Sequence, residues 1–185
     1  FAVAYGDERG MTFVHPFNDP AVIAGQGTVA TEMLAVAPEL EVLIVPIGGG
    51  GLISGMAIAA KAINPKIKVV GVEAQLYPSM LNAVKKSSLP VGGDTLAEGI
   101  AVKTPGTLTQ QIVEALVDDI LLVSEADLER AVSLLITIEK TVVEGAGAAG
   151  LAALLAEPQR FKGRTVGIVL CGGNIDPRLL AYVLL

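Results

Sequence analysis

The chain has no tryptophan, one histidine, one cysteine and only 4% aromatic residues in its 185 positions. A single cysteine excludes an intrachain disulfide, which fits a reducing compartment, and we expect the cytoplasm. One histidine and one cysteine cannot supply the usual ligand cluster of a zinc centre, so we expect no metal site. No stretch reaches the ~18 consecutive apolar residues of a membrane span, so we expect no membrane segment.

Basic residues are also scarce: 13 lysines and arginines stand against 19 acidic residues, for a net charge of −6. Without a basic run, the chain is a poor match for nucleic acid or an anionic membrane. No G-x-S-x-G motif is present, so a serine hydrolase has no support. In contrast, apolar residues make up 52% of the chain and the mean hydropathy is +0.62. We therefore expect part of the surface to be covered, by absent sequence or in a homo-oligomer.

The pattern of apolar runs predicts an α/β fold. Four nearly continuous runs are typical of strands buried on both faces, namely Val42–Ile47, Ile67–Val72, Ile120–Val123 and Thr165–Leu170. Helical patterns separate them, at 19–37 with a possible break at Gly25–Gly27, and at Leu52–Ile63, Glu125–Val142 and Gly147–Ala156. Lys85–Gly106, rich in Gly, Pro, Ser and Thr, is predicted to be a long loop. The alternation indicates one domain over residues 1–185, a parallel twisted sheet with helices on both faces.

Four consecutive glycines, Gly48–Gly51, lie between a predicted strand and a predicted helix in the stretch VPIGGGGLISGM. At a helix N-terminus the free N–H groups and the helix dipole favour an anion, and glycine lets a ligand approach the backbone closely. A tight structural turn usually needs only one glycine. The run therefore predicts an anion site, most simply for a phosphate.

The kind of phosphate ligand stays partly open. A Walker A loop is excluded, because Leu52 and Ile53 stand where Lys and Ser or Thr are required. A dinucleotide-binding domain remains an alternative. Glu73 follows the glycines at about the sequence separation of the acidic residue that binds the ribose in such domains, although the glycines themselves do not have the G-x-G-x-x-G spacing. A non-catalytic interaction fragment, without phosphate affinity, is a further alternative.

A second glycine cluster, LCGGNID, follows the last predicted strand. Parallel strands deliver their carboxyl ends to one edge, so we expect Gly48–Gly51, Glu73 and Cys171–Asn174 on the same edge. Cys171 is either an inert buried thiol or a functional one. Glu144, in VVEGAGAAG, is a carboxylate in an apolar setting that could face the same cleft, whereas the lone His15 is expected to be structural.

Six stretches in this order resemble the serine/threonine dehydratases: FVHPFNDPAVIAGQGT, PIGGGGLISG, VGVEA, LAEGIAV, VVEGAGA and CGGNID. These are pyridoxal-phosphate enzymes of the tryptophan synthase β-like fold, and the resemblance covers essentially the whole chain. It implies the large-domain part of that fold, pyridoxal 5′-phosphate as cofactor and a small amino-acid substrate. The implied reaction is β-elimination of the hydroxyl of threonine, and of serine, giving a 2-oxo acid and ammonia. A serine racemase or another lyase of the family is the alternative.

The resemblance also implies roles for particular residues. The cofactor phosphate would be held by five residues, Gly48, Gly49, Gly50, Gly51 and Leu52. Cys171, with Gly172 beside it, would face the pyridine nitrogen, and Gly99 and Glu144 would flank the ring. A neutral thiol does not hold the ring nitrogen protonated, so the ring is a milder electron sink, which suits β-elimination.

Two features of the family pattern are missing. The Ser-Phe-Lys-x-Arg-Gly motif with the Schiff-base lysine is absent, so we expect residues 1–185 to be the C-terminal portion of a catalytic domain. The N-terminal small domain and part of the large one would then be its missing partner, and the chain alone would be inactive. Some relatives bind a divalent cation with a Glu at the position of Glu73 and an Asp six residues later. Ser79 stands there in this chain, a poorer ligand for a hard cation.

Overall fold

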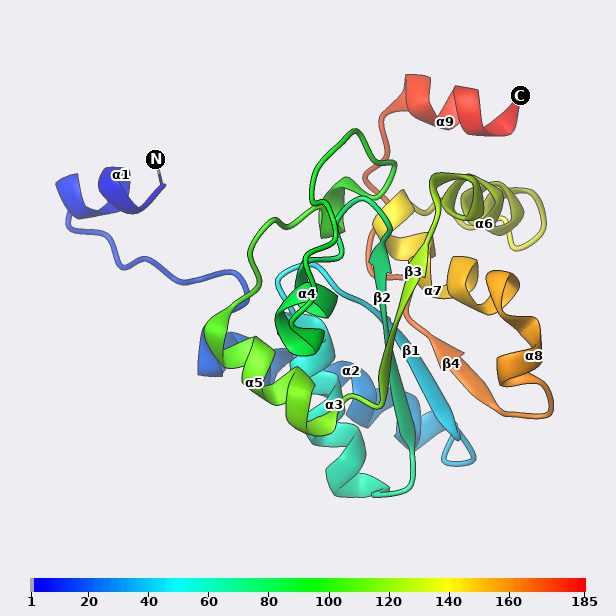
Figure 1. Cartoon of the computed structure of the whole chain (residues 1–185), viewed down its shortest axis with the longest axis horizontal. Coiled ribbons are helices and arrows are strands. Elements are labelled where there is room, and N and C mark those ends of the chain that lie inside the picture. The colour runs from blue at the N-terminus through cyan, green and yellow to red at the C-terminus, as the bar shows by residue number, and fades with distance from the viewer. Residues whose placement is uncertain (1) are drawn as a thin grey trace.

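A computed structural model describes residues 2–185. Its centre is a parallel sheet with the strand order β3-β2-β1-β4 (Figure 1). The strands are β1 (Val42–Pro46), β2 (Lys68–Ala74), β3 (Asp119–Val123) and β4 (Val166–Ile168). In the register, Val42 pairs with Lys68 on one side and with Val166 on the other. All four predicted strands are confirmed, although β4 is shorter than its apolar run.

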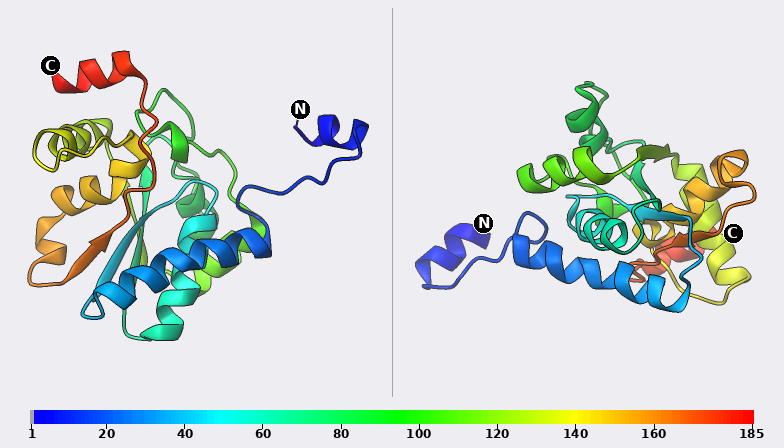
Figure 2. Two further views of the ribbon diagram at one scale, coloured as in Figure 1. Left: turned by 180° about the vertical axis from the view of Figure 1, so that it is seen from behind. Right: turned by 90° about the horizontal axis from the view of Figure 1, so that it is seen from below.

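Helices cover both faces of this sheet, as predicted (Figures 1 and 2). One face carries α2 (Pro20–Val36), α3 (Gly51–Ile63), α4 (Ser79–Lys85) and α5 (Thr107–Leu116). The other carries α6 (Glu125–Thr137), α7 (Gly145–Ala156) and α8 (Pro158–Phe161), and α9 (Pro177–Leu184) lies beyond α6. A short 3-10 turn, η1 (Glu98–Ile100), lies in the long connection between α4 and α5.

The core consists of two apolar layers, one on each face of the central strand β1. Because successive side chains of a strand point to opposite faces, Leu43 and Val45 join the layer beneath α2 and α3. Val42 and Ile44 join the layer beneath α6 and α7. This double burial explains why the run is continuously apolar and not alternating.

Helix α2 is unbroken, so the predicted interruption at Gly25–Gly27 is wrong. Gly27 is buried against α3, where a Cβ on it would lie 3.0 Å from the carbonyl oxygen of Gly55. A Cβ on Gly55 would in turn collide with the carbonyl oxygen of Ile23. The small residues thus let two helices approach closely, and they do not end either helix.

Other boundaries differ from the prediction in identifiable ways. Helix α6 ends at Thr137 and not at Val142, and Lys140 then takes a positive φ of 58° that no helix contains. Helix α7 begins at Gly145, two residues earlier than predicted. The loop Lys85–Gly106 is largely irregular, as predicted, apart from η1.

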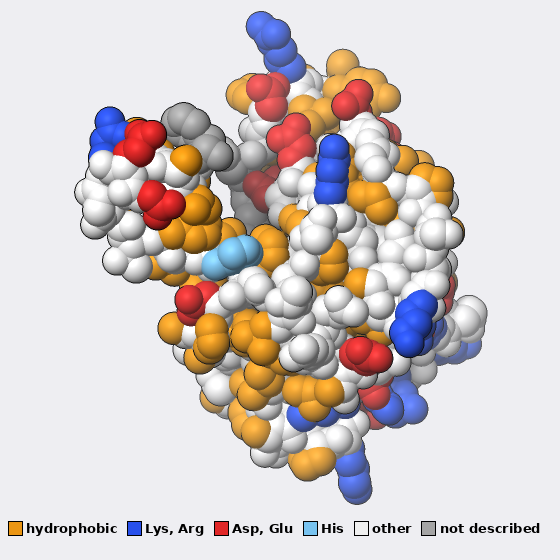
Figure 3. Space-filling view, turned by 60° about the vertical axis from the view of Figure 1, so that its left-hand side comes forward, with side chains coloured by type: hydrophobic (Ala, Val, Ile, Leu, Met, Phe, Trp, Pro, Cys, Tyr) orange, Lys and Arg blue, Asp and Glu red, His pale blue; other side chains and the backbone are white. Residues whose placement is uncertain are grey.

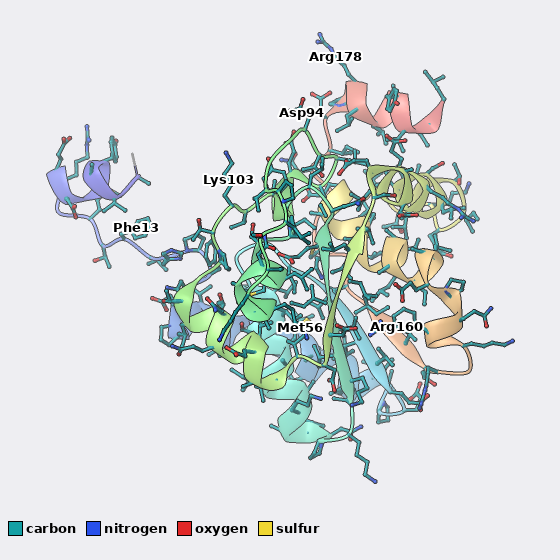
Figure 4. All side chains as sticks on the ribbon, in the orientation of Figure 1. Phe13, Met56, Asp94, Lys103, Arg160 and Arg178 are labelled. Atoms are coloured by element: carbon teal, nitrogen blue, oxygen red, sulfur yellow. The ribbon has the colours of Figure 1, made fainter. Side chains whose placement is uncertain are left out.

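An arm, residues 2–14, projects from the body and contains the short helix α1 (Ala2–Glu8) (Figures 1 and 2). Phe13 lies on this arm, well away from the sheet (Figure 4), and it is exposed, as are Met11 and Val14. Across residues 2–185, no helix has both the length and the apolar character needed to cross a bilayer.

Candidate functional site

The segments singled out in the sequence meet at one edge of the sheet. The carboxyl end of β1 leads into Gly48–Gly51, and Glu73 stands at the carboxyl end of β2. The segment Cys171–Asn174 follows β4. Since all pairs in the sheet are parallel, these three segments lie at the same edge, as the sequence predicts.

The glycine loop, Gly48–Gly51, leaves a row of backbone donors without protein acceptors. Gly50 is the N-cap of α3 in a left-handed conformation with φ of 94°, and no side chain caps the helix. The N–H groups of Gly48 through Leu52 donate to no acceptor among residues 2–185. Free N–H groups at the positive end of a 13-residue helix form a site that suits an anion.

The glycines of this loop are required by packing against the rest of the chain. A Cβ on Gly49 would collide with the ring of Phe17, and one on Gly51 would lie 3.0 Å from the Phe17 Cβ. A Cβ on Gly50 would lie 2.6 Å from the Cε of Met80. From the sequence, we expect glycine here because it lets a ligand approach the backbone closely. At these three positions it is needed for another reason: protein atoms occupy the space where a Cβ would lie.

The loop is also held through its carbonyl groups. The hydroxyl of Thr109, which is fully buried, donates to the Gly49 oxygen at 2.6 Å, and the Gly106 N–H donates to the same oxygen at 3.2 Å. These contacts anchor the loop to the start of α5 and leave its N–H groups free. No sequence motif predicts the roles of Thr109 and Phe17, because both come from parts of the chain distant from the loop.

A second group of predicted site residues gathers around Glu144. Its N–H donates to the oxygen of Gly172 at 3.1 Å, and its Oε2 accepts from the N–H of Asn174 at 3.0 Å. A Cβ on Gly99 would lie 2.8 Å from Oε1 of the same carboxylate. The Glu144 side chain thus lies between η1 and the glycine turn that follows β4, and it lines a cavity of about 350 Å³ with Glu98.

Cys171 stands beside this group with its Sγ 3.9 Å from the oxygen of Ala146. The residue as a whole is exposed, so it is not the buried cysteine that one of the two alternatives describes, although its thiol is partly shielded from solvent. Desolvation of the thiol, and then the negative charge of Glu144, raise the pKa of Cys171 above its ordinary value. The thiol is therefore neutral near pH 7.

The side chain of Glu73 forms hydrogen bonds within the protein interior. Its side chain is 1% exposed, and its two oxygens accept from the N–H groups of Met80 at 2.7 Å and Leu81 at 2.9 Å, at the start of α4. Burial raises the pKa of Glu73 to about 7, against the opposing effect of these amides. A carboxylate held in this way is not available to a ribose, which removes the argument for a dinucleotide domain. The hydroxyl of Ser79 donates to the oxygen of Val102 at 2.6 Å.

Comparisons with known proteins agree with this arrangement. A family model described as "Pyridoxal-phosphate dependent enzyme" matches residues 2–172. The L-threonine ammonia-lyase of Thermotoga maritima is 45% identical over 185 residues, which cover 99% of this chain and 46% of that protein. The L-threonine dehydratase catabolic TdcB of Escherichia coli (strain K12) is 44% identical over 172 residues, covering 91% of this chain and 52% of that protein.

Solved structures also superimpose closely on this chain. A threonine deaminase from the organism abbreviated T.th. superimposes with a TM-score of 0.88 at 40% identity, covering 95% of this chain and 59% of that one. Maize serine racemase gives a TM-score of 0.88 at 37% identity, covering 97% of this chain and 57% of that one. The chain thus spans about half the length of the curated relatives it matches.

Proposed function

Because the chain belongs to the family of pyridoxal-phosphate dependent enzymes, we propose that it forms the cofactor-binding portion of an ammonia-lyase acting on threonine and serine. The reaction would be β-elimination of the substrate hydroxyl, giving a 2-oxo acid and ammonia. The names of the relatives, L-threonine ammonia-lyase and L-threonine dehydratase, support this substrate class.

One observation carries the proposal: the N–H groups of Gly48 through Leu52 have no acceptor among the described residues, and they lie at the start of α3. A phosphate monoester is a dianion with several acceptor oxygens, and it would satisfy these donors together. Thr109 and Phe17 keep the loop in a fixed position, so the donors need no rearrangement on binding. The residues present therefore fit the phosphate of pyridoxal phosphate.

The residues gathered around Glu144 fit the ring of the cofactor. Pyridoxal phosphate, when bound, withdraws electrons from the substrate Cα and makes its proton acidic. Cys171 would face the pyridine nitrogen as a neutral thiol, and the raised pKa of that thiol supports this protonation state. Gly99 and Glu144 would flank the ring, with the Glu144 carboxylate fixed by the N–H of Asn174.

The proton transfer at Cα needs a base, and in this family that role belongs to the Schiff-base lysine. None of its lysines stands in a Ser-Phe-Lys-x-Arg-Gly motif. We therefore propose that residues 1–185 are the C-terminal portion of a catalytic domain, and that the chain alone has no dehydratase activity. The complete enzyme is proposed to be a cytoplasmic homo-oligomer.

The phosphate site can be tested with pyridoxine 5′-phosphate, which lacks the aldehyde that would react with surface lysines. Titration of the ¹⁵N-labelled chain is expected to shift the amide signals of Gly48 through Leu52, whereas pyridoxine without phosphate should leave them in place. Gly50→Ala should abolish the shifts, because φ at Gly50 is 94° and a Cβ there meets Met80. Gly163→Ala is the matched control, since Gly163 also has positive φ but has free space around its Cα. Equal shifts with both compounds would overturn the proposal.

Amino-acid racemisation is a second candidate for the complete enzyme. Two solved serine racemases superimpose on this chain with TM-scores of 0.88 and 0.85. Both reactions begin with removal of the Cα proton, and they differ in whether the hydroxyl leaves. Assay of the complete enzyme with L-serine separates them: elimination releases ammonia, and racemisation yields D-serine.

A further inference from the structure

The arm joins the body through a tight turn, residues 15–18, that is organised by the chain's one histidine. The Nδ1 atom of His15 accepts from the N–H of Asn18 at 3.0 Å and from the N–H of Phe17 at 3.3 Å. An accepting Nδ1 requires the tautomer with its proton on Nε2. Figure 3 shows the histidine where the arm meets the body.

Local sequence explains why a side chain is needed at this point. Pro16 has no N–H, and the residue before a proline favours extended backbone, so His15 can reach forward to the next amides. Asp19 likewise reaches forward to the amides of the first turn of α2, where its Oδ1 accepts from Ala21 N at 2.8 Å and from Val22 N at 3.2 Å. Two side chains in succession thus accept from backbone donors, His15 from those of the turn and Asp19 from those of the first turn of α2.

This turn is in direct contact with the glycine loop. The Phe17 ring occupies the space that a Cβ on Gly49 would need, and the Phe17 backbone lies 3.1 Å from where a Cβ on Gly51 would be. The ring of Phe17 also packs edge-on against His15, with centroids 4.6 Å apart. The Oδ1 of Asn18 accepts from Leu108 N at 2.9 Å, which fixes the turn to α5, the same helix that holds the Gly49 carbonyl.

We propose that His15 is a positioning residue for the anion-binding amides: its Nδ1 fixes the turn 15–18, and the turn holds Phe17 against Gly49 and Gly51. The inference rests on the proposed phosphate site and extends it, because it connects the arm to the loop that would bind the cofactor. Any displacement of the arm that breaks the His15 contacts would release Phe17 and loosen the loop.

A pair of substitutions separates the acceptor from the ring. His15→Asn keeps an acceptor near the position of Nδ1 and loses the ring, whereas His15→Phe keeps an aromatic ring and loses the acceptor. With inorganic phosphate as the probe, His15→Phe is expected to weaken binding about tenfold, as the loss of an acceptor for two amides implies. His15→Asn should stay within about threefold of the unmodified chain. Val14→Ala, at an exposed neighbouring position, is the control. Equal affinity in both His15 variants would overturn the proposal.

A ligand-free measurement distinguishes this inference from the phosphate site itself. Hydrogen exchange at the amides of Gly106 and Ser54, which donate to the oxygens of Gly49 and Gly50, should accelerate in His15→Phe and in Phe17→Ala, and should be unchanged in His15→Asn. If the unmodified chain binds no phosphate but exchange follows this order, the proposed function fails and the positioning role of His15 stands. Unchanged exchange in His15→Phe and Phe17→Ala would refute the positioning role, whatever the phosphate result.

Discussion

The buried carboxyl group of Glu73 should make the stability of this chain depend on pH in an unusual direction. Carboxylates that pair with a cation or accept hydrogen bonds usually have lowered pKa values, and they stabilise a protein as pH rises. Burial instead raises the pKa of Glu73 from 4.5 to about 7, against the opposing effect of the amides of Met80, Leu81 and Ser79. The folded state therefore holds this proton more tightly than the unfolded state does. The stabilisation is complete below pH 4.5 and is lost as pH rises through about 7.

The size of the effect follows from the difference between the two pKa values. Each pKa unit corresponds to about 1.4 kcal/mol, so the interval from 4.5 to about 7 corresponds to about 3 kcal/mol of unfolding free energy. That amount is a large part of the total stability of a typical domain. Carboxyl groups with lowered pKa values, such as Glu41 and Asp118, change stability mainly at lower pH.

Urea unfolding followed by circular dichroism from pH 5 to pH 8 tests this reasoning. The unmodified chain should lose about 3 kcal/mol across the range from Glu73 alone, and Glu73→Gln should lack that component because its side chain does not ionise. Glu114→Gln, at an exposed position on α5, is the control and should keep the slope of the unmodified chain. The same slope for Glu73→Gln and the unmodified chain would refute the assignment.

Three further substitutions test other contacts. Gly55→Ala should destabilise the chain by about 1–3 kcal/mol in thermal unfolding, because the new Cβ collides with the Ile23 oxygen; unchanged stability would contradict the close packing of α2 on α3. Asp19→Ala removes the N-cap of α2 and should cost about 1 kcal/mol in urea unfolding at pH 7, whereas an exposed control, Asp7→Ala, should cost little. Asp118→Asn weakens contacts with two lysines and a backbone N–H, and should cost about 2 kcal/mol at pH 7. The pKa of Asp118 is lowered, so its stabilisation is lost as pH falls below 3.8, and the cost of the substitution should shrink there.

The elements that the sequence predicted are those whose signals are local. Strand β1 is apolar on both faces because helices cover both, and the glycines after it mark the start of α3. Helix α9 begins with Asp176–Pro177 as α2 begins with Asp19–Pro20, so the same local pattern indicates the start of both helices. Helix α4 has no side-chain cap at its own N-terminus. Instead, the carboxylate of Glu73 in β2 accepts hydrogen bonds from the N–H groups of Met80 and Leu81 in its first turn. No local sequence pattern indicates such a contact.

In the candidate site, too, some residues could be predicted from local sequence motifs and others could not. The glycine loop and the Cys171 turn were visible as short motifs at strand ends. The residues that hold the loop, Phe17 and Thr109, are separated from it by long stretches of sequence, and only the fold brings them together. The run of glycines predicts space for a ligand, whereas contact with Phe17 and Thr109 already requires glycine in this loop.

The strand order has a consequence for how the chain is made. The central strand β1 can pair with β2 early, but its other edge stays open until β4 has been synthesised, because Val42 pairs with Val166. Pairing between such distant residues is slow, since a long loop must close before the contact forms. On the ribosome, the unprotected edge of β1 is the place where two nascent chains would associate wrongly. A chaperone that shields this edge should raise the yield of native protein more than one that acts on the finished chain.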